Sequence, residues 1–245
     1  MSINKPSIST CLSPNMLHLY DVSSSIVVII DVLRATSTIA TALCNGAKAI
    51  IPVDSVAECI RLGKQIDAVT AGERDGHIAE GLANGNSPFE YSKKFIAGKT
   101  LVLTTTNGTK LLHMALNMSA KEIITGSFPN LSAVCSHLLK QKENVILACA
   151  AWKDKINIED TLFAGAVIQK IQAHFTIDCD SSQMSLLLYN NAKADMYRFM
   201  ENYNASHFRR LTNYGLEKDI RYCLTPDGAD VLPKFSGGKL ITTAT

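Results

Sequence analysis

Residues 26–38 read IVVIIDVLRATST, in which five β-branched residues are followed by an acid, an arginine and three hydroxyl side chains. β-branched residues favour strands, and Ser and Thr favour the first positions of helices. The stretch therefore predicts a buried strand over 26–30 that turns directly into a helix beginning near Thr36. In open α/β sheets such turns gather at the carboxyl ends of the strands, where free backbone N–H groups bind anions.

The same alternation of short apolar runs and helix-like stretches recurs along the chain. It predicts an α/β fold with three α/β/α layers around a mixed, largely parallel sheet. We expect strands at 8–12, 26–30, 49–53, 68–71, 100–104, 122–125, 145–150 and 228–232. We expect helices to begin near Thr36, Ser55, Asn107, Asn130, Glu159, Ser181, Ala205 and Leu216. Residues 72–88 contain four glycines and a proline among charged residues, which indicates a long loop.

Composition limits the class of protein. The 245 residues include 24 basic and 22 acidic residues, and a chain of this length can bury a core without disulfides, so we expect a single domain over residues 1–245. The net charge of +2 argues against nucleic-acid binding, and no apolar run is long enough to cross a membrane. The seven cysteines include no C-x-x-C pair, which indicates neither a disulfide framework nor a zinc cluster. We expect a cytoplasmic protein.

Asp31 follows the first strand quoted above and can bind a divalent cation, accept a proton or cap the next helix. Arg34 and the hydroxyl residues after it favour a functional interpretation, because a guanidinium group beside free N–H groups forms a site for oxyanions. We interpret Arg34, Thr36 and Ser37 as phosphate-binding candidates. The alternative is a plain helix cap for Asp31 and a surface position for Arg34.

A second strand-to-helix turn spans residues 104–109, which read TTTNGT. A glycine lets the backbone approach a ligand closely, and hydroxyl groups can donate to phosphate oxygens. The turn lacks the spacing of a Walker loop. Its phosphate-binding candidates are Thr105, Thr106, Asn107, Gly108 and Thr109. The alternative is a threonine-rich strand end with an asparagine cap.

Acidic residues supply most of the remaining candidates. Glu159 and Asp160 stand at the start of a predicted helix, where one can face the crevice while the other caps the helix or orients a neighbouring group. Alternatively, both only complement the helix dipole. The long loop adds further candidates, which are Glu73, Arg74, Asp75, Asn86 and Ser87. Its charged residues form either a second wall of the site or a solvated charge run.

Other phosphatase chemistries fit the sequence poorly. No cysteine is followed by an arginine six positions later, which argues against a cysteine-phosphatase loop. The Asp-x-Asp pattern at 178–180 follows only a short apolar run, so it is a weak match to an aspartyl-phosphate enzyme. The histidines show no H-x-x-x-H spacing, and only His77 and His207 lie near polar clusters, as minor candidates.

Five motifs resemble the 2-phosphosulfolactate phosphatase family in their order and spacing. They are DVLRATSTI at 31–39, GERDG at 72–76, GNSP at 85–88, TTTNGT at 104–109 and EDTLFAG at 159–165. The resemblance continues more weakly through ASHFRRL at 205–211, Asp219 and residues 222–224 to Pro233. The chain departs from the family pattern at Ala83, where members often carry an acid.

The resemblance implies a magnesium-dependent hydrolase that removes phosphate from 2-phospho-3-sulfolactate, a step toward coenzyme M in methanogens. Asp31 with Glu159 or Asp160 would then bind Mg²⁺ through a few carboxylates and several waters. Arg34, Arg74 and the 104–109 turn would hold the phosphate and the acid end of the substrate. Glu73 or Asp75 would act as acid/base or as an outer ligand of the metal.

The expected partner is therefore a small anionic phosphorylated substrate, with no nucleic acid and no membrane, and a homodimer stays open. Two alternatives remain at this stage. One is a non-catalytic protein that binds a phosphorylated metabolite, and the other is a metal-dependent phosphatase for another sugar or sulfonate phosphate. Phosphate release that depends on a metal ion separates an enzyme from a sensor.

Overall fold

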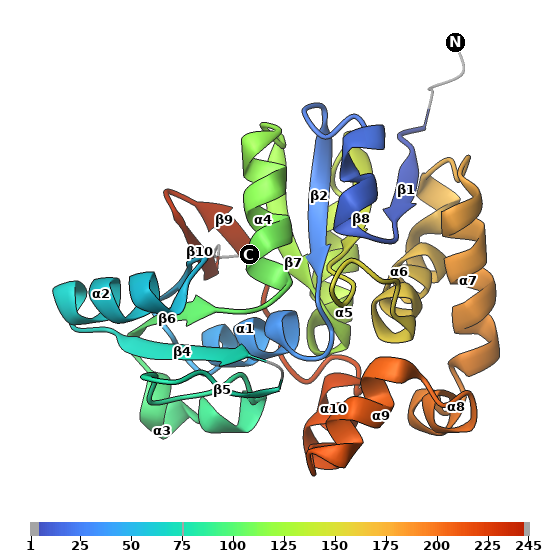
Figure 1. Cartoon of the computed structure of the whole chain (residues 1–245). Coiled ribbons are helices and arrows are strands. Elements are labelled where there is room, and N and C mark those ends of the chain that lie inside the picture. Colours follow the sequence, from blue (N-terminus) through green and yellow to red (C-terminus); the bar gives the residue numbers. More distant parts are fainter. Residues whose placement is uncertain (1–4, 75, 243–245) are drawn as a thin grey trace.

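The computed structural model describes residues 5–74 and 76–242. Strands form a mixed sheet with helices packed on both faces, which confirms the predicted α/β fold (Figure 1). The described strands are β1 (Ile8–Cys11), β2 (Ser25–Ile30), β3 (Ala49–Pro52), β4 (Val69–Arg74), β5 (His77–Ile78), β6 (Thr100–Thr104), β7 (Glu122–Gly126), β8 (Asn144–Cys149), β9 (Pro233–Ser236) and β10 (Lys239–Thr242).

The helices alternate with the strands over most of the chain. The described α-helices are α1 (Ala35–Cys44), α2 (Val56–Ile66), α3 (Lys93–Ile96), α4 (Gly108–Asn117), α5 (Leu131–Leu138), α6 (Ile158–Ile171), α7 (Asp180–Ala192), α8 (Met196–Asn202), α9 (Ser206–Asn213) and α10 (Glu217–Cys223). Short 3-10 helices are η1 (Pro14–Leu19), η2 (Pro88–Glu90), η3 (Phe128–Asn130) and η4 (Gln172–His174). Each of the eight predicted helix starts lies one residue from an observed helix start.

The sheet consists of two parallel groups of strands joined by an antiparallel hairpin, in the order β1-β8-β2-β7-β9-β10-β3-β6-β4-β5. β1, β8, β2 and β7 are parallel to one another, and so are β3, β6 and β4. β9 and β10 pair antiparallel with each other and with their neighbours, so the second group runs opposite to the first in the sheet.

The two groups nevertheless direct their carboxyl ends at the same region. In Figure 1, β2 runs down the view toward α9 and α10, whereas β4 and β6 run across it toward the centre of the molecule. The hairpin joins the groups through short ladders, since β9 pairs with β7 at Ile124 and Lys234, and β10 pairs with β3 at Leu240 and Ile50. Strong twist across this narrow junction brings the two sets of strand ends together.

β2 shows why the sequence folds into layers, because all of its residues are buried. Ile26, Val28 and Ile30 belong to the core that α5 and α6 complete, whereas Val27 and Ile29 belong to the core that α1 and α4 complete. Successive side chains of a strand point to opposite faces. A strand that is apolar at every position therefore requires a helical layer on each side.

The carboxyl-terminal strands differ from the prediction. The expected strand at 228–232 is absent, because this segment runs along η3, where the Ala229 N–H donates to the Pro129 carbonyl at 2.8 Å. The strands begin at Pro233 instead and form a hairpin whose turn residues Gly237 and Gly238 have φ of +56° and +80°. Two-residue hairpin turns need such positive φ values, which glycine adopts without strain.

The predicted long loop also contains regular structure at its start. β4 extends to Arg74 and pairs with β5 in a short antiparallel hairpin, in register Glu73 with Ile78 and Arg74 with His77. The rest of the segment leads to η2 and contains the 85–88 motif. This β4–β5 hairpin carries Glu73 and Gly76 to the carboxyl end of β2.

The last helices of the chain cover the carboxyl end of the first strand group, where Figure 1 shows α9 and α10 beneath β2. Within the described ranges, no helix combines the length and the apolar character that a membrane span requires. The functional consequence of this arrangement is that one cavity receives residues from both halves of the sheet and from the carboxyl-terminal helices.

Candidate active site

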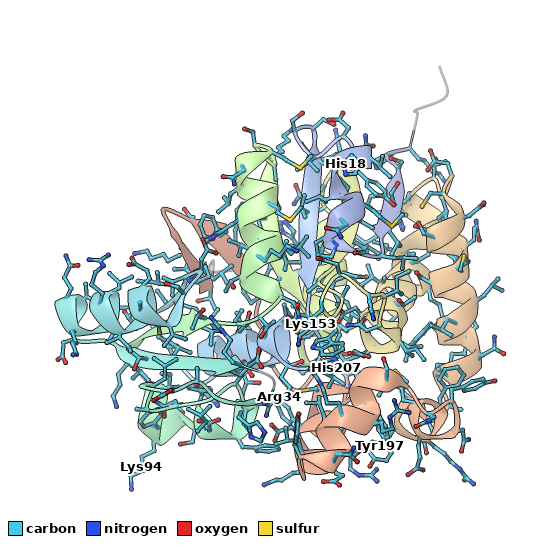
Figure 2. The ribbon with its side chains drawn as sticks, in the orientation of Figure 1. His18, Arg34, Lys94, Lys153, Tyr197 and His207 are labelled. Carbon is cyan, nitrogen blue, oxygen red and sulfur yellow. The ribbon has the colours of Figure 1, made fainter. Side chains whose placement is uncertain are left out.

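A small polar cavity lies where the carboxyl end of β2, the turn after β6, the β4–β5 hairpin, the loop after β8 and helix α9 meet. Figure 2 shows Arg34, Lys153 and His207 gathered at this central position, from three segments far apart in the sequence. The lining residues are Asp31, Leu33, Arg34, Glu73, Gly76, Asn86, Thr106, Asn107, Trp152, His207, Arg210 and Leu211.

Asp31 follows β2 directly and is 8% exposed. Its Oδ1 accepts from the N–H of Ala35, the first residue of α1, at 3.4 Å. Burial is the main reason why the pKa of Asp31 is raised to about 6, and the negative charges of Glu73 and Glu159 raise it further. The positive charge of a nearby His207 opposes this shift.

Glu159 lies in the first turn of α6, with its side chain buried. Its Oε1 is hydrogen-bonded to Nδ1 of His207, while Oε2 has no hydrogen-bond partner among the described residues. A buried carboxylate oxygen without a donor is costly unless a cation or an ordered water satisfies it. A cation or an ordered water at Oε2 would satisfy this oxygen.

Asp160 is turned toward the backbone. Its Oδ1 accepts from the Val32 N–H at 2.9 Å, and its Oδ2 accepts from the Ala151 N–H at 3.2 Å and from Asn157 Nδ2 at 2.9 Å. Burial and the charges of Glu159 and Asp31 raise the pKa of this carboxyl well above its usual range. Asp160 thus joins the ends of β2 and β8 to the start of α6 and does not line the cavity.

The family resemblance implied Asp31 with either Glu159 or Asp160 as metal ligands, and the hydrogen bonds of Asp160 favour Glu159. Among residues 5–74 and 76–242, no three His, Cys, Asp or Glu side chains form a cluster that could hold a metal ion. Asp160 uses both oxygens on N–H donors, which leaves Asp31 and Glu159. These two carboxylates fit Mg²⁺, which often takes one or two carboxylates and completes its shell with waters and substrate phosphate.

Arg34 is 6% exposed and lines the cavity, so it is not the surface residue that the sequence left as an alternative. Its Nη1 donates to Asp219 Oδ2 at 2.5 Å, and its Nη2 donates to the Gly76 carbonyl at 3.5 Å. The guanidinium group is thus held from the side of α10 and of the β4–β5 hairpin. A planar group fixed in this way can present its remaining N–H bonds to an oxyanion.

The hydroxyl groups of α1 are placed differently from the prediction. Thr36 Oγ1 accepts from the Asp31 N–H at 3.1 Å, and Ser37 Oγ donates to the Val32 carbonyl at 2.8 Å. Both side chains are buried and neither lines the cavity. They close the tight turn between β2 and α1, because short hydroxyl side chains readily bond to nearby backbone groups.

Residues of the turn after β6 line two different cavities. Thr106 and Asn107 line the polar cavity, whereas Thr105, Gly108 and Thr109 line a neighbouring apolar one. Thr105 Oγ1 accepts from the Thr109 N–H at 3.3 Å, so Thr105 caps α4. A Cβ atom at Gly108 would lie 2.9 Å from Asp31 Oδ2. Glycine is therefore required here for the close approach of α4 to the Asp31 carboxylate.

Glu73 connects the β4–β5 hairpin to this turn. Its Oε1 accepts from the Thr106 N–H at 3.1 Å and from Thr106 Oγ1 at 2.9 Å, and its Oε2 accepts from the Gly76 N–H at 3.0 Å. Arg74 points away from the cavity and donates to Thr104 Oγ1 at 3.0 Å. Glu73 and Arg74 thus hold the cavity wall together. Asp75 lies outside the described residues.

The 85–88 motif contributes the opposite wall. Asn86 is 3% exposed and lines the cavity, and its Oδ1 has no hydrogen-bond partner among the described residues. Ser87 lies just behind, where its Oγ donates to Asp219 Oδ1 at 3.1 Å. The departure from the family pattern at Ala83 has no effect on this wall, because Ala83 is exposed and does not line the cavity.

Comparison with known proteins gives the family of the chain. A family model described as 2-phosphosulpholactate phosphatase matches residues 11–238. The chain belongs to this family. A protein from Caldanaerobacter subterraneus, named probable 2-phosphosulfolactate phosphatase, is 40% identical over 233 residues, which cover 94% of the chain and 95% of the relative.

Two further relatives carry the same name. One from Thermotoga petrophila is 40% identical over 215 residues, covering 87% of the chain and 90% of the relative. One from Clostridium novyi is 34% identical over 221 residues, covering 89% and 92%. The predicted family is therefore confirmed, and with it the assignment to an enzyme family of phosphoric monoester hydrolases.

In this member of the 2-phosphosulpholactate phosphatase family, the cavity is also lined by residues that the sequence analysis did not assign to the site. Trp152 and Arg210 line the cavity, and the Arg210 guanidinium carbon lies 4.1 Å from the centre of the Trp152 ring. His207 was only a minor candidate, although its segment matched the family motif at 205–211. The signal was present in that motif, but only the packing of α9 against the strand ends reveals the contact with Glu159.

Cys149 provides a first prediction, because it ends β8 near the site. It is 1% exposed, does not line the cavity, and burial together with the Asp160 charge raises the pKa of its thiol well above the usual range. A protonated thiol is a poor nucleophile. The variant Cys149→Ser should therefore keep most of its activity. Loss of phosphate release with an unchanged thermal midpoint would instead indicate a covalent thiol mechanism.

Proposed function

We propose that the protein is a magnesium-dependent phosphatase that hydrolyses 2-phospho-3-sulfolactate, the phosphate monoester of a 2-hydroxy acid, to 3-sulfolactate and phosphate. The relatives named probable 2-phosphosulfolactate phosphatase support the substrate. The observation that carries the proposal is a cavity lined by Asp31, Arg34 and His207. The buried Glu159 contacts His207 there, and its Oε2 lacks a partner among the described residues.

Two buried carboxylates, Asp31 and Glu159, support the proposed metal requirement. Asp31 and Glu159 would hold Mg²⁺, which when bound neutralises phosphate charge and lowers the pKa of a bound water. Burial is the main cause of the raised pKa of Asp31, and the charges of Glu73 and Glu159 add to it. A bound divalent cation would offset this cost of the charged carboxylate.

Individual cavity residues then have separate roles in phosphoryl transfer. Arg34 binds the non-bridging phosphate oxygens and stabilises the charge that spreads over them in the transition state. His207 is held by Glu159 through Nδ1, and its Nε2 supplies the proton that the leaving 2-hydroxy oxygen needs. Arg210, on the Trp152 ring, supplies positive charge for the acid end of the substrate. Glu73 positions the Thr106 turn.

The metal requirement is the second prediction and also tests the proposed function. Phosphate release from 2-phospho-3-sulfolactate should cease when a chelator removes divalent ions and return with Mg²⁺ or Mn²⁺, both of which accept oxygen ligands. Phosphate release is measured against a panel of phosphorylated 2-hydroxy acids and sugar phosphates, each with and without metal.

The outcomes separate the alternatives. Full turnover in excess chelator contradicts the metal site. Faster hydrolysis of a sugar phosphate than of any 2-hydroxy acid ester assigns a different substrate. Saturable binding without phosphate release under every metal condition indicates a sensor of phosphorylated metabolites.

A further inference from the structure

Asp219 is the one acidic group of α10 whose side chain reaches two walls of the cavity, among the residues that the structure describes. Its Oδ2 accepts from Arg34 Nη1 at 2.5 Å, and its Oδ1 accepts from Ser87 Oγ at 3.1 Å. The Asp219 and Arg34 side chains are 8% and 6% exposed. One buried carboxylate thus connects the start of α1, the 85–88 motif and the carboxyl-terminal helices.

We propose that Asp219 is a positioning residue for phosphoryl transfer, which aims the Arg34 guanidinium group into the cavity. This inference rests on the proposed function and concerns the same site. A free arginine has many side-chain rotamers, and fixing it before the substrate binds removes that entropic cost from the reaction. Asp219 holds one edge of the guanidinium fork and leaves the rest for the phosphate.

The surroundings of α10 show that Asp219 itself is rigidly placed. Ile220 and Cys223 anchor α10 in the core with no exposed surface. Tyr222 Oη is hydrogen-bonded to Thr41 Oγ1 at 2.8 Å, so α10 contacts α1 at a second point beyond Arg34. The Tyr222 ring also packs on Phe89, with ring centres 5.2 Å apart. Because α10 is fixed by these contacts, its Asp219 carboxylate holds Arg34 in one position.

A purely structural ion pair is the competing explanation, and kinetics distinguish the two. The variant Asp219→Asn keeps the Arg34 charge, so attraction to the phosphate persists and KM should change by less than about threefold. Orientation is lost, and kcat should fall by roughly 10- to 100-fold, the scale of misplacing a catalytic group. A structural pair would lower the thermal midpoint and leave kcat of the folded protein unchanged.

The decisive experiment is a double-mutant cycle with Arg34→Lys, because Asp219 is proposed to act through Arg34. In the Arg34→Lys background, Asp219→Asn should change kcat by less than about twofold. Asp227→Asn is a matched control, since Asp227 accepts from the Ser132 N–H and Oγ, each at 2.8 Å, on the surface of the same carboxyl-terminal segment. This control should retain wild-type kcat. An equal loss from Asp219→Asn in both backgrounds overturns the proposal.

Removing one partner of a buried ion pair can prevent folding, so Ser87→Ala provides a second route. It removes the other hydrogen bond to Asp219 and should lower kcat by roughly threefold, again only when Arg34 is present. The cycle is measured with 2-phospho-3-sulfolactate and with p-nitrophenyl phosphate. If the wild-type protein cleaves p-nitrophenyl phosphate but not 2-phospho-3-sulfolactate, the proposed substrate is wrong. The role of Asp219 is then still tested by the kcat values for p-nitrophenyl phosphate. A kcat of Asp219→Asn within twofold of wild type overturns that role.

Discussion

Asp31→Asn is expected to lower kcat by on the order of 10³-fold, the scale of removing a preorganised charged group from a buried site. The amide keeps the shape of the side chain and can still accept from the Ala35 N–H, but it loses the charge that would hold Mg²⁺. Initial rates at saturating substrate and Mg²⁺ measure the loss. A variant with near wild-type kcat would remove Asp31 from the mechanism.

The same substitution should not destabilise the metal-free fold. Burial raises the pKa of Asp31 to about 6, so its contribution to stability is largest below the pKa of the unfolded chain and is lost as the pH rises through 6. At about pH 8 the wild-type protein carries a buried charge that the amide lacks. The thermal midpoint of Asp31→Asn in chelator should therefore equal or exceed that of the wild type.

Asp160→Asn is the matched control, because it is an acid of the same region with a different role. Both oxygens of Asp160 accept from N–H groups. In the asparagine variant, an NH₂ group replaces one of these oxygens and faces an N–H donor that it cannot bind. We expect a stability loss of about 2 kcal/mol, the typical cost of a buried unsatisfied group. For a chain of this size that lowers the thermal midpoint by roughly 4–8 °C. Calorimetry of the two variants side by side separates the catalytic from the structural acid.

Arg34→Lys is expected to lower kcat/KM by about 10²-fold, because an ammonium group cannot bind Asp219 and phosphate oxygens with the geometry of a planar fork. Lysine retains the positive charge, so the thermal midpoint should change much less than the rate. Both quantities are measured on the same preparation.

The control for Arg34→Lys is Arg61→Lys on α2, where the side chain is 61% exposed and forms a surface ion pair with Glu58 at 2.7 Å. Exposed ion pairs contribute little to the free energy of unfolding, so this variant should match the wild type in thermal midpoint and in kcat/KM. A large fall in the thermal midpoint of Arg34→Lys with an unchanged kcat/KM would assign Arg34 to the fold alone.

Local sequence patterns predicted the helices well because their signals act within a few residues. The Ser55 side chain accepts from the Glu58 N–H at 3.1 Å, as the capping pattern indicates. Asn157 likewise caps α6 by accepting from the Asp160 N–H at 3.2 Å. The run of β-branched residues at 26–30 required burial on both faces, and β2 has it. These features depend on propensity and periodicity, which a sequence displays directly.

Side-chain roles in the site were harder to predict, because neighbouring polar residues of one turn point in different directions. Thr36 and Ser37 are adjacent to the cavity in sequence, yet their hydroxyl groups bond to the backbone. Glu159 and Asp160 differ in the same way, since Glu159 contacts His207 and Asp160 accepts backbone N–H groups. Which of two adjacent side chains faces a cavity depends on the packing of the helix that carries them.

The sequence by itself determined the α/β class, the turns that follow β2 and β6, and the family, because each is encoded in a short contiguous stretch. Only the tertiary structure decided that these turns share one cavity. The strands β4 and β6 run opposite to β2 in the sheet, and their ends meet because β9 and β10, from the far end of the chain, join the two groups. His207 and Asp219 arrive from the same distant segment. Contacts between residues more than a hundred positions apart form through packing of the whole core, which no local pattern specifies.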